Sequence, residues 1–192
     1  MGRVDLRGHD CGDASKYSYR SRRLWGFLEI SQLDCDIFDC CIVPHVLCGG
    51  NLANVRAMKN VLENGPPQNL WNIYGPIECM ALVTLTRVTL EETSRERISI
   101  GSPIGETVLV LLDENQNTIR DSGRRGEIYL EGSQQSLGYL NRLYETSQSF
   151  VYLARKRMGF PGEGAVRLYR TGDMAEWCDA TYLLDFAGRT NN

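Results

Sequence analysis

Two short segments, far apart in the sequence, carry side chains that could together hold a nucleotide. Residues 72–78 read Asn-Ile-Tyr-Gly-Pro-Ile-Glu, and residues 169–173 read Tyr-Arg-Thr-Gly-Asp. Tyr74 offers an aromatic face on which a purine can stack. Glu78 can coordinate Mg²⁺, which bridges phosphate oxygens, and Asp173 can accept hydrogen bonds from two ribose hydroxyls. Either segment alone is typical of an ordinary loop, whereas the two together indicate a nucleotide site.

The composition is that of a globular protein and argues against two classes of partner. Of the 192 residues, 42% are hydrophobic and 23% are charged, as expected for a chain with one ordinary core. The 21 Lys and Arg face 24 Asp and Glu without a long basic block, which argues against a nucleic-acid surface. No apolar run reaches membrane-spanning length, and the polar start does not resemble a signal peptide. We therefore expect a cytoplasmic protein without nucleic-acid or membrane partners.

Seven cysteines are the unusual feature of the composition. Four of them surround His45, namely Cys35, Cys40, Cys41 and Cys48. An odd total favours reduced thiols over a disulfide framework. A zinc site is the alternative, although the paired Cys-x2-Cys spacing of well-defined zinc sites is missing. The apolar run at residues 40–47 instead predicts a buried strand in which cysteine acts as a small hydrophobic residue.

The next elements predict a parallel strand–helix–strand unit. Apolar residues recur at helical spacing over residues 52–62, after Asn51, which is suited to cap a helix. The sequence Asn-Gly-Pro-Pro at residues 64–67 should end this helix, and residues 70–73 form the second strand. Ligands bind outside the carboxyl ends of such parallel strands. The glycine pair 49–50 and the start of the first nucleotide segment both lie there.

From residue 80 onward the pattern changes to short strands joined by turns, which predicts a small antiparallel β-barrel or sheet. The expected strands are residues 107–112, 127–131, 167–170, 174–177 and 182–186, with turns at 113–117, 121–123 and 179–181. Residues 154–165 are expected to form a solvated loop. The fold class is therefore α/β, with a parallel unit followed by an antiparallel one.

Five motifs in register resemble the adenylate-forming ligases, and most closely the amino-acid adenylation domains of nonribosomal peptide synthetases. Besides the two opening segments, they are residues 100–104 (Ile-Gly-Ser-Pro-Ile), 126–142 (Gly-Glu-Ile through Gly-Tyr-Leu-Asn-Arg) and 188–191 (Gly-Arg-Thr-Asn). The resemblance covers roughly residues 45–192 and implies the C-terminal part of the family's large lobe.

This resemblance also implies a division of the chain. Residues 45–80 would end the α/β sheet subdomain and carry the adenine-binding loop, and residues 81–192 would form the β-barrel subdomain, ending at the hinge of a lid. Residues 1–44 carry no recognisable motif and are left unassigned, as a loosely ordered segment.

The resemblance implies roles for individual residues at the nucleotide site. The site would comprise Gly49, Gly50, Asn72, Tyr74, Gly75, Glu78, Asp173, Phe186 and Arg189. Asn72 would contact the adenine amino group, and Glu78 would be the metal ligand, holding Mg²⁺. Phe186 would lie near the nucleotide, with a simple core residue as the alternative. Arg189 would reach the ribose or the phosphates, with an ordinary surface charge as the alternative.

A partial substrate pocket is implied in the same way. Its lining would be Leu47, Gly49, Ile73, Ala81 and Leu82. Since none of these residues is polar, a nonpolar amino-acid side chain fits best.

Several positions depart from the family pattern. Ile77 replaces a hydroxyl residue that contacts the α-phosphate, which removes a hydrogen bond worth roughly 1.5–3 kcal/mol. Asn51 replaces a Glu, and Asn191 replaces the Asp of the lid hinge. The family's phosphate-gripping loop and its lid lysine find no counterpart, because the lysines here are Lys16, Lys59 and Lys156, none in a matching motif.

We therefore expect a fragment of an ATP- and Mg²⁺-dependent adenylation domain, with no catalytic residue of its own. The parent would form aminoacyl-AMP and pass the acyl group to a phosphopantetheine thiol on a carrier-protein domain. A fragment of an acyl-CoA or aryl-acid ligase is one alternative. A non-catalytic remnant that binds nucleotide weakly is another.

The chain by itself should not exchange pyrophosphate into ATP with any amino acid, because it contains neither the phosphate loop nor the lysine motif. Exchange assays on the purified protein test this expectation. Activity above that of a sample without protein would contradict the interpretation as an inactive fragment.

Overall fold

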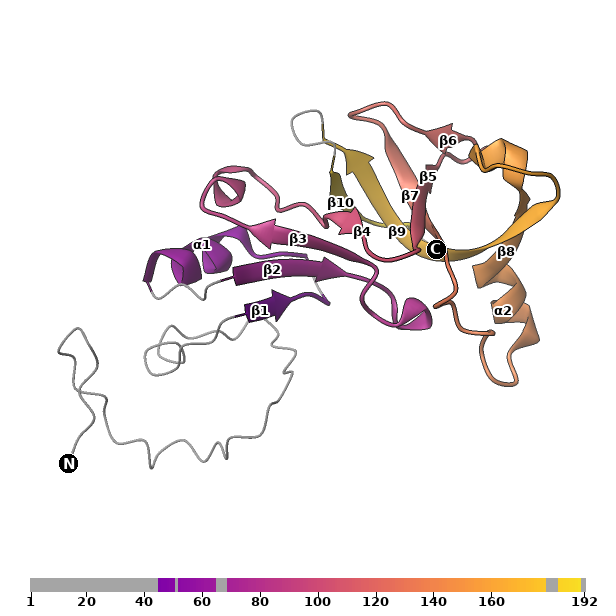
Figure 1. Cartoon of the computed structure of the whole chain (residues 1–192), viewed down its shortest axis with the longest axis horizontal. Helices are drawn as coiled ribbons and strands as arrows, with labels where there is room; N and C mark the ends of the chain where they lie inside the picture. Colours follow the sequence, from indigo (N-terminus) through magenta and orange to yellow (C-terminus); the bar gives the residue numbers. More distant parts are fainter. Residues whose placement is uncertain (1–44, 51, 65–68, 179–182, 191–192) are drawn as a thin grey trace.

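Two β-sheets lie side by side in the computed structural model, which describes residues 45–50, 52–64, 69–178 and 183–190 (Figure 1). The first sheet has the strand order β1 (His45–Cys48), β2 (Asn69–Tyr74), β3 (Thr84–Val88) and β4 (Ser102–Pro103). Strand β1 pairs in parallel with β2, whereas β3 and β4 add antiparallel pairs. The predicted parallel unit is therefore confirmed, but the sheet that contains it extends well beyond residue 80.

Helix α1 (Val55–Asn64) connects the two parallel strands and covers one face of the first sheet. Its cap is Asn54, whose side-chain oxygen accepts a hydrogen bond from the amide of Ala57 at 3.0 Å. The predicted cap, Asn51, lies outside the described residues. Met58 and Val61 point from the helix into a core shared with β1, β2 and β3. None of the helices in the described ranges is long and apolar enough to cross a membrane.

The second sheet is antiparallel and curled. Its strands are β5 (Val108–Leu112), β6 (Thr118–Ile119), β7 (Arg125–Glu131), β8 (Phe150–Ala154), β9 (Ala165–Trp177) and β10 (Leu184–Arg189). The order is β10-β9-β7-β5-β6, and β8 pairs with β9 along the edge that β10 also uses. Because β6 and β10 end this order without pairing with each other, the described strands form a curled half-barrel, which confirms the predicted antiparallel sheet but not a complete barrel.

Two predictions for this sheet are wrong in detail. The segments expected as separate strands, 167–170 and 174–177, belong to the single 13-residue strand β9. Between these segments lies a bulge, at which the pairing of β9 with β7 shifts register. The expected loop at 154–165 contains a 3₁₀ turn, Arg155–Met158, whose Met158 is buried against the outer face of the sheet.

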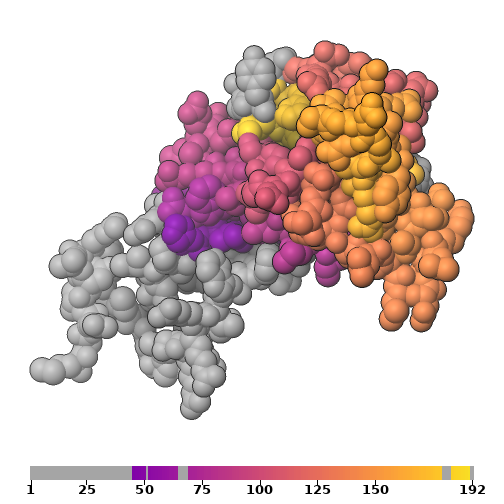
Figure 2. Space-filling model, turned by 45° about the vertical axis from the view of Figure 1, so that its right-hand side comes forward, coloured from indigo at the N-terminus to yellow at the C-terminus, as the bar shows by residue number. Residues whose placement is uncertain are grey.

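Helix α2 (Leu143–Ser149) was not predicted at all. It projects from the curled sheet, in the orange region at the lower right of Figure 2, and buries none of its residues. Leu137, Leu140 and Leu143 nearby are 87–96% exposed. A helix without buried residues carries no periodic pattern of apolar residues, so the sequence gives no signal for it.

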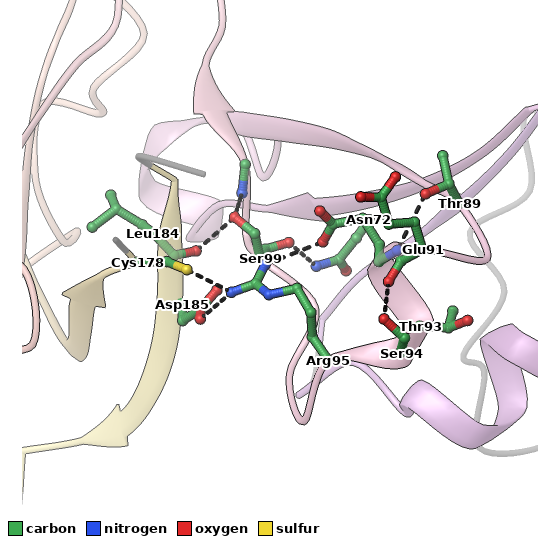
Figure 3. Close-up of polar contacts among 12 residues, drawn as sticks. Asn72, Thr89, Glu91, Thr93, Ser94, Arg95, Ser99, Cys178, Leu184 and Asp185 are labelled. Carbon is green, nitrogen blue, oxygen red and sulfur yellow. Dashed lines mark hydrogen bonds and ion pairs between the residues drawn. The ribbon is translucent and has the colours of Figure 1, made fainter. Parts of the chain in front are cut away.

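One core joins the two sheets. Cys79, Val83 and Ile100 come from the first sheet and its connections, and they pack with Ile128 and Leu184 of the second. Polar contacts continue this junction (Figure 3). The hydroxyl of Ser99 donates to the carbonyl of Leu184 at 2.8 Å, and Arg95 pairs with Asp185 at 2.7 Å.

Gly101 should be indispensable at this junction. It has φ +89°, bridges to Leu184, and a Cβ there would overlap the backbone of Leu85. Gly101→Ala should lower the free energy of unfolding by about 2–4 kcal/mol, through backbone strain and overpacking together. Gly105→Ala is the matched control, because Gly105 also has positive φ but faces open space. Urea denaturation should show a loss of only about 1 kcal/mol for the control, and equal losses would exclude the steric explanation.

Candidate functional site

Tyr74 and Asp173 come from different sheets and meet in a hydrogen bond. Tyr74 ends β2, and its hydroxyl donates to Oδ2 of Asp173 at 2.8 Å. The Tyr74 ring is half-buried and packs against the core that both sheets share. Burial, together with the charge of Asp173, raises the pKa of Tyr74, so the hydroxyl stays protonated and can donate. The two segments with which the sequence analysis begins are therefore in direct contact.

Both oxygens of the Asp173 carboxylate have partners within the chain. Oδ2 accepts from Tyr74, and Oδ1 lies 3.2 Å from Nε of Arg189. Burial raises the pKa of Asp173, the partners Tyr74 and Arg189 lower it, and the charges of Glu127 and Glu78 raise it again. The Arg189 side chain is 72% exposed, against 15% for Asp173. Arg189 is thus the partner that a ligand hydroxyl can replace at least cost.

The bulge in β9 presents the Asp173 side chain. Gly172 has φ +72°, a conformation that glycine adopts without strain. The Thr171 hydroxyl donates to the carbonyl of Ile128 at 2.9 Å and accepts from the amide of Asp173 at 3.0 Å. The Gly172 amide, which the bulge removes from the sheet ladder, donates to Oε1 of Glu127 at 3.1 Å. Each backbone amide of the bulge is therefore held by a side chain.

Glu78 is held by a chain of tyrosines. The Tyr139 hydroxyl donates to Oε1 of Glu78 at 2.7 Å and lies 3.4 Å from the hydroxyl of Tyr169. The amide of Ser136 donates to the carbonyl of Glu78 at 2.7 Å. Segments that are distant in the sequence thus converge on Glu78, through its carboxylate and through its backbone carbonyl, and the charge of Glu78 acts on Asp173 as well.

The turn after Tyr74 requires glycine. A Cβ on Gly75 would lie 2.7–2.8 Å from backbone atoms of Ala81, Leu82 and Val83. The chain reverses here through two residues with left-handed backbone, Met80 (φ 63°) and Ala81 (φ 58°). This close return brings the predicted pocket residues Ala81 and Leu82 beside the end of β2.

The predicted substrate-pocket residues come from adjacent strand ends and this turn. Leu47 and Gly49 lie in and just after β1, and Ile73 lies on β2. A Cβ on Gly49 would meet Cγ1 of Ile73 at 2.5 Å, so the two strand ends are in close contact. Ile73 is buried, whereas Leu47, Ala81 and Leu82 are half-buried.

Three predicted nucleotide residues lie somewhat apart from the Tyr74–Asp173 contact. Asn72 is buried, and its side-chain amide donates to the carbonyl of Ser99 at 2.8 Å (Figure 3). Phe186 packs against the shared core. Gly50 is exposed, with φ +92° and open space around it.

The positions that depart from the family pattern are partly visible. Ile77 follows the Gly-Pro turn and is 84% exposed, next to Glu78. No hydroxyl stands at that point of the surface. Asn51 and Asn191 lie outside the described residues.

The cysteine cluster can be followed only in part. His45 is exposed and Cys48 is buried, and burial raises the pKa of the Cys48 thiol to about 12. Cys35, Cys40 and Cys41 lie outside the described residues. Among those that are described, no three His, Cys, Asp or Glu side chains are grouped as metal ligands.

Four residues of the site were not singled out from the sequence, namely Glu127, Tyr139, Tyr169 and Arg170. All four are letters of the motifs quoted above, so the signal was present. Spacing along the chain does not reveal that Arg170 pairs with Glu127 or that Tyr139 reaches Glu78. The first pairing depends on the register of β7 with β9, and the second joins two connecting segments that meet only in the folded chain.

Asp173 should make the stability of the protein depend on pH. Because its pKa is raised by folding, its contribution to the free energy of unfolding is complete below the ordinary value of about 3.9 and is lost as pH rises through the folded pKa. Asp173→Asn cannot ionise, so its stability relative to the wild type should improve as pH rises from about 4 to 7. Urea denaturation across this range measures the trend.

Asp113→Asn should show the opposite dependence of stability on pH. Backbone amides of Asn117 and Asn115 lower the pKa of Asp113, so its contribution is present above about pH 4 and is lost below it. The free energy of unfolding of this variant, relative to that of the wild type, should therefore increase only as pH falls. A parallel trend for the two variants would contradict the assignment of a raised pKa to Asp173.

Comparison with known proteins identifies the family of the chain. Residues 12–140 match the family described as AMP-binding enzyme, a range that begins upstream of the first motif recognised in the sequence. The nonribosomal peptide synthetase asaC of Aspergillus flavus is 38% identical over 151 residues, which are 78% of this chain and 14% of that protein. The chain thus spans about one seventh of this relative.

Solved structures give the same result. A nonribosomal peptide synthetase protein that contains adenylation and PCP domains superposes with a TM-score of 0.68 and 33% identity, over 76% of this chain and 28% of that one. A four-domain nonribosomal peptide synthetase bound to AMP and glycine superposes with a TM-score of 0.63 and 30% identity. The match covers 76% of this chain and 10% of that one. With most of its length matched by both sequence and structure, the chain belongs to the family of AMP-binding enzymes.

Proposed function

We propose that this chain holds the adenosine part of a nucleotide within an amino-acid adenylation domain. The observation that carries the proposal is the hydrogen bond between Tyr74 and Asp173, which sets an aromatic ring beside a buried carboxylate. The reaction of the whole domain would be ATP plus an amino acid giving aminoacyl-AMP and pyrophosphate. Family membership supports ATP as the nucleotide.

In the proposed complex the base stacks on Tyr74 and the ribose hydroxyls donate to Asp173. The exposed Arg189 leaves Asp173 and is then free to reach the phosphates. Gly49, Gly50 and Gly75 let the backbone approach the ligand closely. Asn72 contributes by fixing the end of β2, since its amide already binds Ser99.

Phe186 has a supporting place in the proposal. It contacts the core under the site, from the strand that ends at Arg189. We assign it packing below the nucleotide rather than a polar contact.

Mg²⁺ fits this arrangement with Glu78 as its protein ligand. Mg²⁺ in nucleotide sites commonly takes one or two carboxylates and completes its shell with phosphate oxygens and water. The Tyr139 hydroxyl orients the Glu78 carboxylate, so the ligand is fixed before the metal arrives. Bound there, the ion would neutralise phosphate charge.

The amino acid would lie against Leu47, Gly49, Ile73, Ala81 and Leu82, a lining that favours a nonpolar side chain. A carrier domain with phosphopantetheine would take the product, as suggested by the matched protein that contains adenylation and PCP domains. Nucleotide binding without catalysis is the second candidate. The exposed Ile77 supports it, because the α-phosphate loses a hydroxyl partner there.

Titration of AMP into the wild type and Asp173→Ala by calorimetry tests the nucleotide site. Loss of a charged acceptor should weaken binding by roughly 1.5–3 kcal/mol. Asp121→Ala is the control, because the Asp121 side chain is 76% exposed and lies at a distant turn. Equal AMP affinities for wild type and Asp173→Ala would contradict the proposed nucleotide site.

A further inference from the structure

We propose that Glu127 and Arg170 are positioning residues that hold the β9 bulge so that Asp173 can receive the ribose. This inference rests on the proposed nucleotide site. Neither side chain has to touch the nucleotide. Both act through the backbone of Gly172, next to Asp173.

The Glu127 carboxylate is surrounded by donors. Nε of Arg170 lies 2.8 Å and 3.0 Å from its two oxygens, the Gly172 amide donates at 3.1 Å, and the Tyr129 hydroxyl donates at 3.4 Å. Glu127 is 9% exposed. A buried carboxylate is tolerated only when it is paired and hydrogen-bonded in this way.

The position of Glu127 matches the irregularity in the sheet. The register of β7 with β9 shifts between Glu127 and Tyr129, directly across from the bulge. A bulge leaves backbone groups unpaired, and a buried amide without a partner is costly. Glu127 accepts a hydrogen bond from the Gly172 amide, which has no partner in the strand pairing at this register shift. Arg170, just before the bulge on the same strand, fixes the carboxylate in place.

The charges support the same assignment. Glu127 is one of the negative groups that raise the pKa of Asp173. Arg170 neutralises Glu127 through a paired contact, so the negative charge of the buried carboxylate is balanced near Asp173. Glu127 and Arg170 thus hold the bulge in one conformation without contacting the Asp173 oxygens, whose partners are Tyr74 and the exposed Arg189.

A purely structural role is the competing explanation, in which the ion pair stabilises the sheet and nothing else. The two explanations differ in their effect on ribose recognition. A displaced Asp173 weakens AMP but not an analogue without ribose hydroxyls. General loosening of the sheet weakens both ligands alike.

The test measures the affinities of AMP and 2′,3′-dideoxyadenosine monophosphate for wild type, Glu127→Gln and Arg170→Lys. Wild type should prefer AMP by roughly tenfold or more, the value of hydrogen bonds to a charged acceptor. Glu127→Gln should lose most of this preference while binding the analogue almost as wild type does. Arg170→Lys keeps the charge but not the planar fork, so it should fall between them. If Glu127→Gln fails to fold, Arg170→Lys still tests the positioning role.

Arg125→Gln is the matched control. Arg125 forms an ion pair with Glu176 between the same two strands, at 3.1 Å, away from the bulge. It should keep the full preference for AMP.

An unchanged preference in Glu127→Gln and Arg170→Lys, or equal weakening of both ligands, would overturn the positioning role. A wild-type protein that binds AMP and the analogue equally would instead reject the ribose contact of Asp173, and with it the proposed function.

Discussion

The hydrogen bond between Tyr74 and Asp173 sets the distance between the two sheets at the point where the candidate site lies. Tyr74 cannot move independently, because the turn that follows it is fixed by the close backbone approach at Gly75. Asp173 cannot move independently either, because Thr171 and Glu127 hold the bulge that carries it. The remaining contacts of the site depend on these two anchored ends being brought together.

The core shared by the two sheets, and the hydrogen bonds beside it, bring Tyr74 and Asp173 together. Leu184 on β10 takes part in the core and accepts hydrogen bonds from both the Ser99 hydroxyl and the Ile100 amide. Thus the last described strand is joined to the segment that precedes β4. The two sheets therefore share one core and several hydrogen bonds, and a side chain from each, Tyr74 and Asp173, lies within hydrogen-bond distance of the other.

Continuous apolar runs predicted the strands that carry them, whereas elements without such runs were missed even where some of their residues are buried. The parallel pair β1 and β2 and the strands β5 and β7 carry apolar runs, and they were predicted. Strands β3 and β8, in which more and less buried residues alternate, and helix α2, none of whose residues is buried, were not predicted. The pairing of Glu127 with Arg170 depends on strand register, which the local sequence does not encode.

The two partners of Asp173 have a consequence for how the proposed site would fill. A ribose hydroxyl that bonds Oδ1 would compete there with the Arg189 guanidinium, although each carboxylate oxygen can accept more than one hydrogen bond. Arg189 ends β10, and the next residue, Thr190, hydrogen-bonds to the carbonyl of Gly172. Displacement of Arg189 would therefore be felt at the end of this strand. Binding of a nucleotide at Asp173 would thus be detectable at Arg189, whose side chain is 72% exposed.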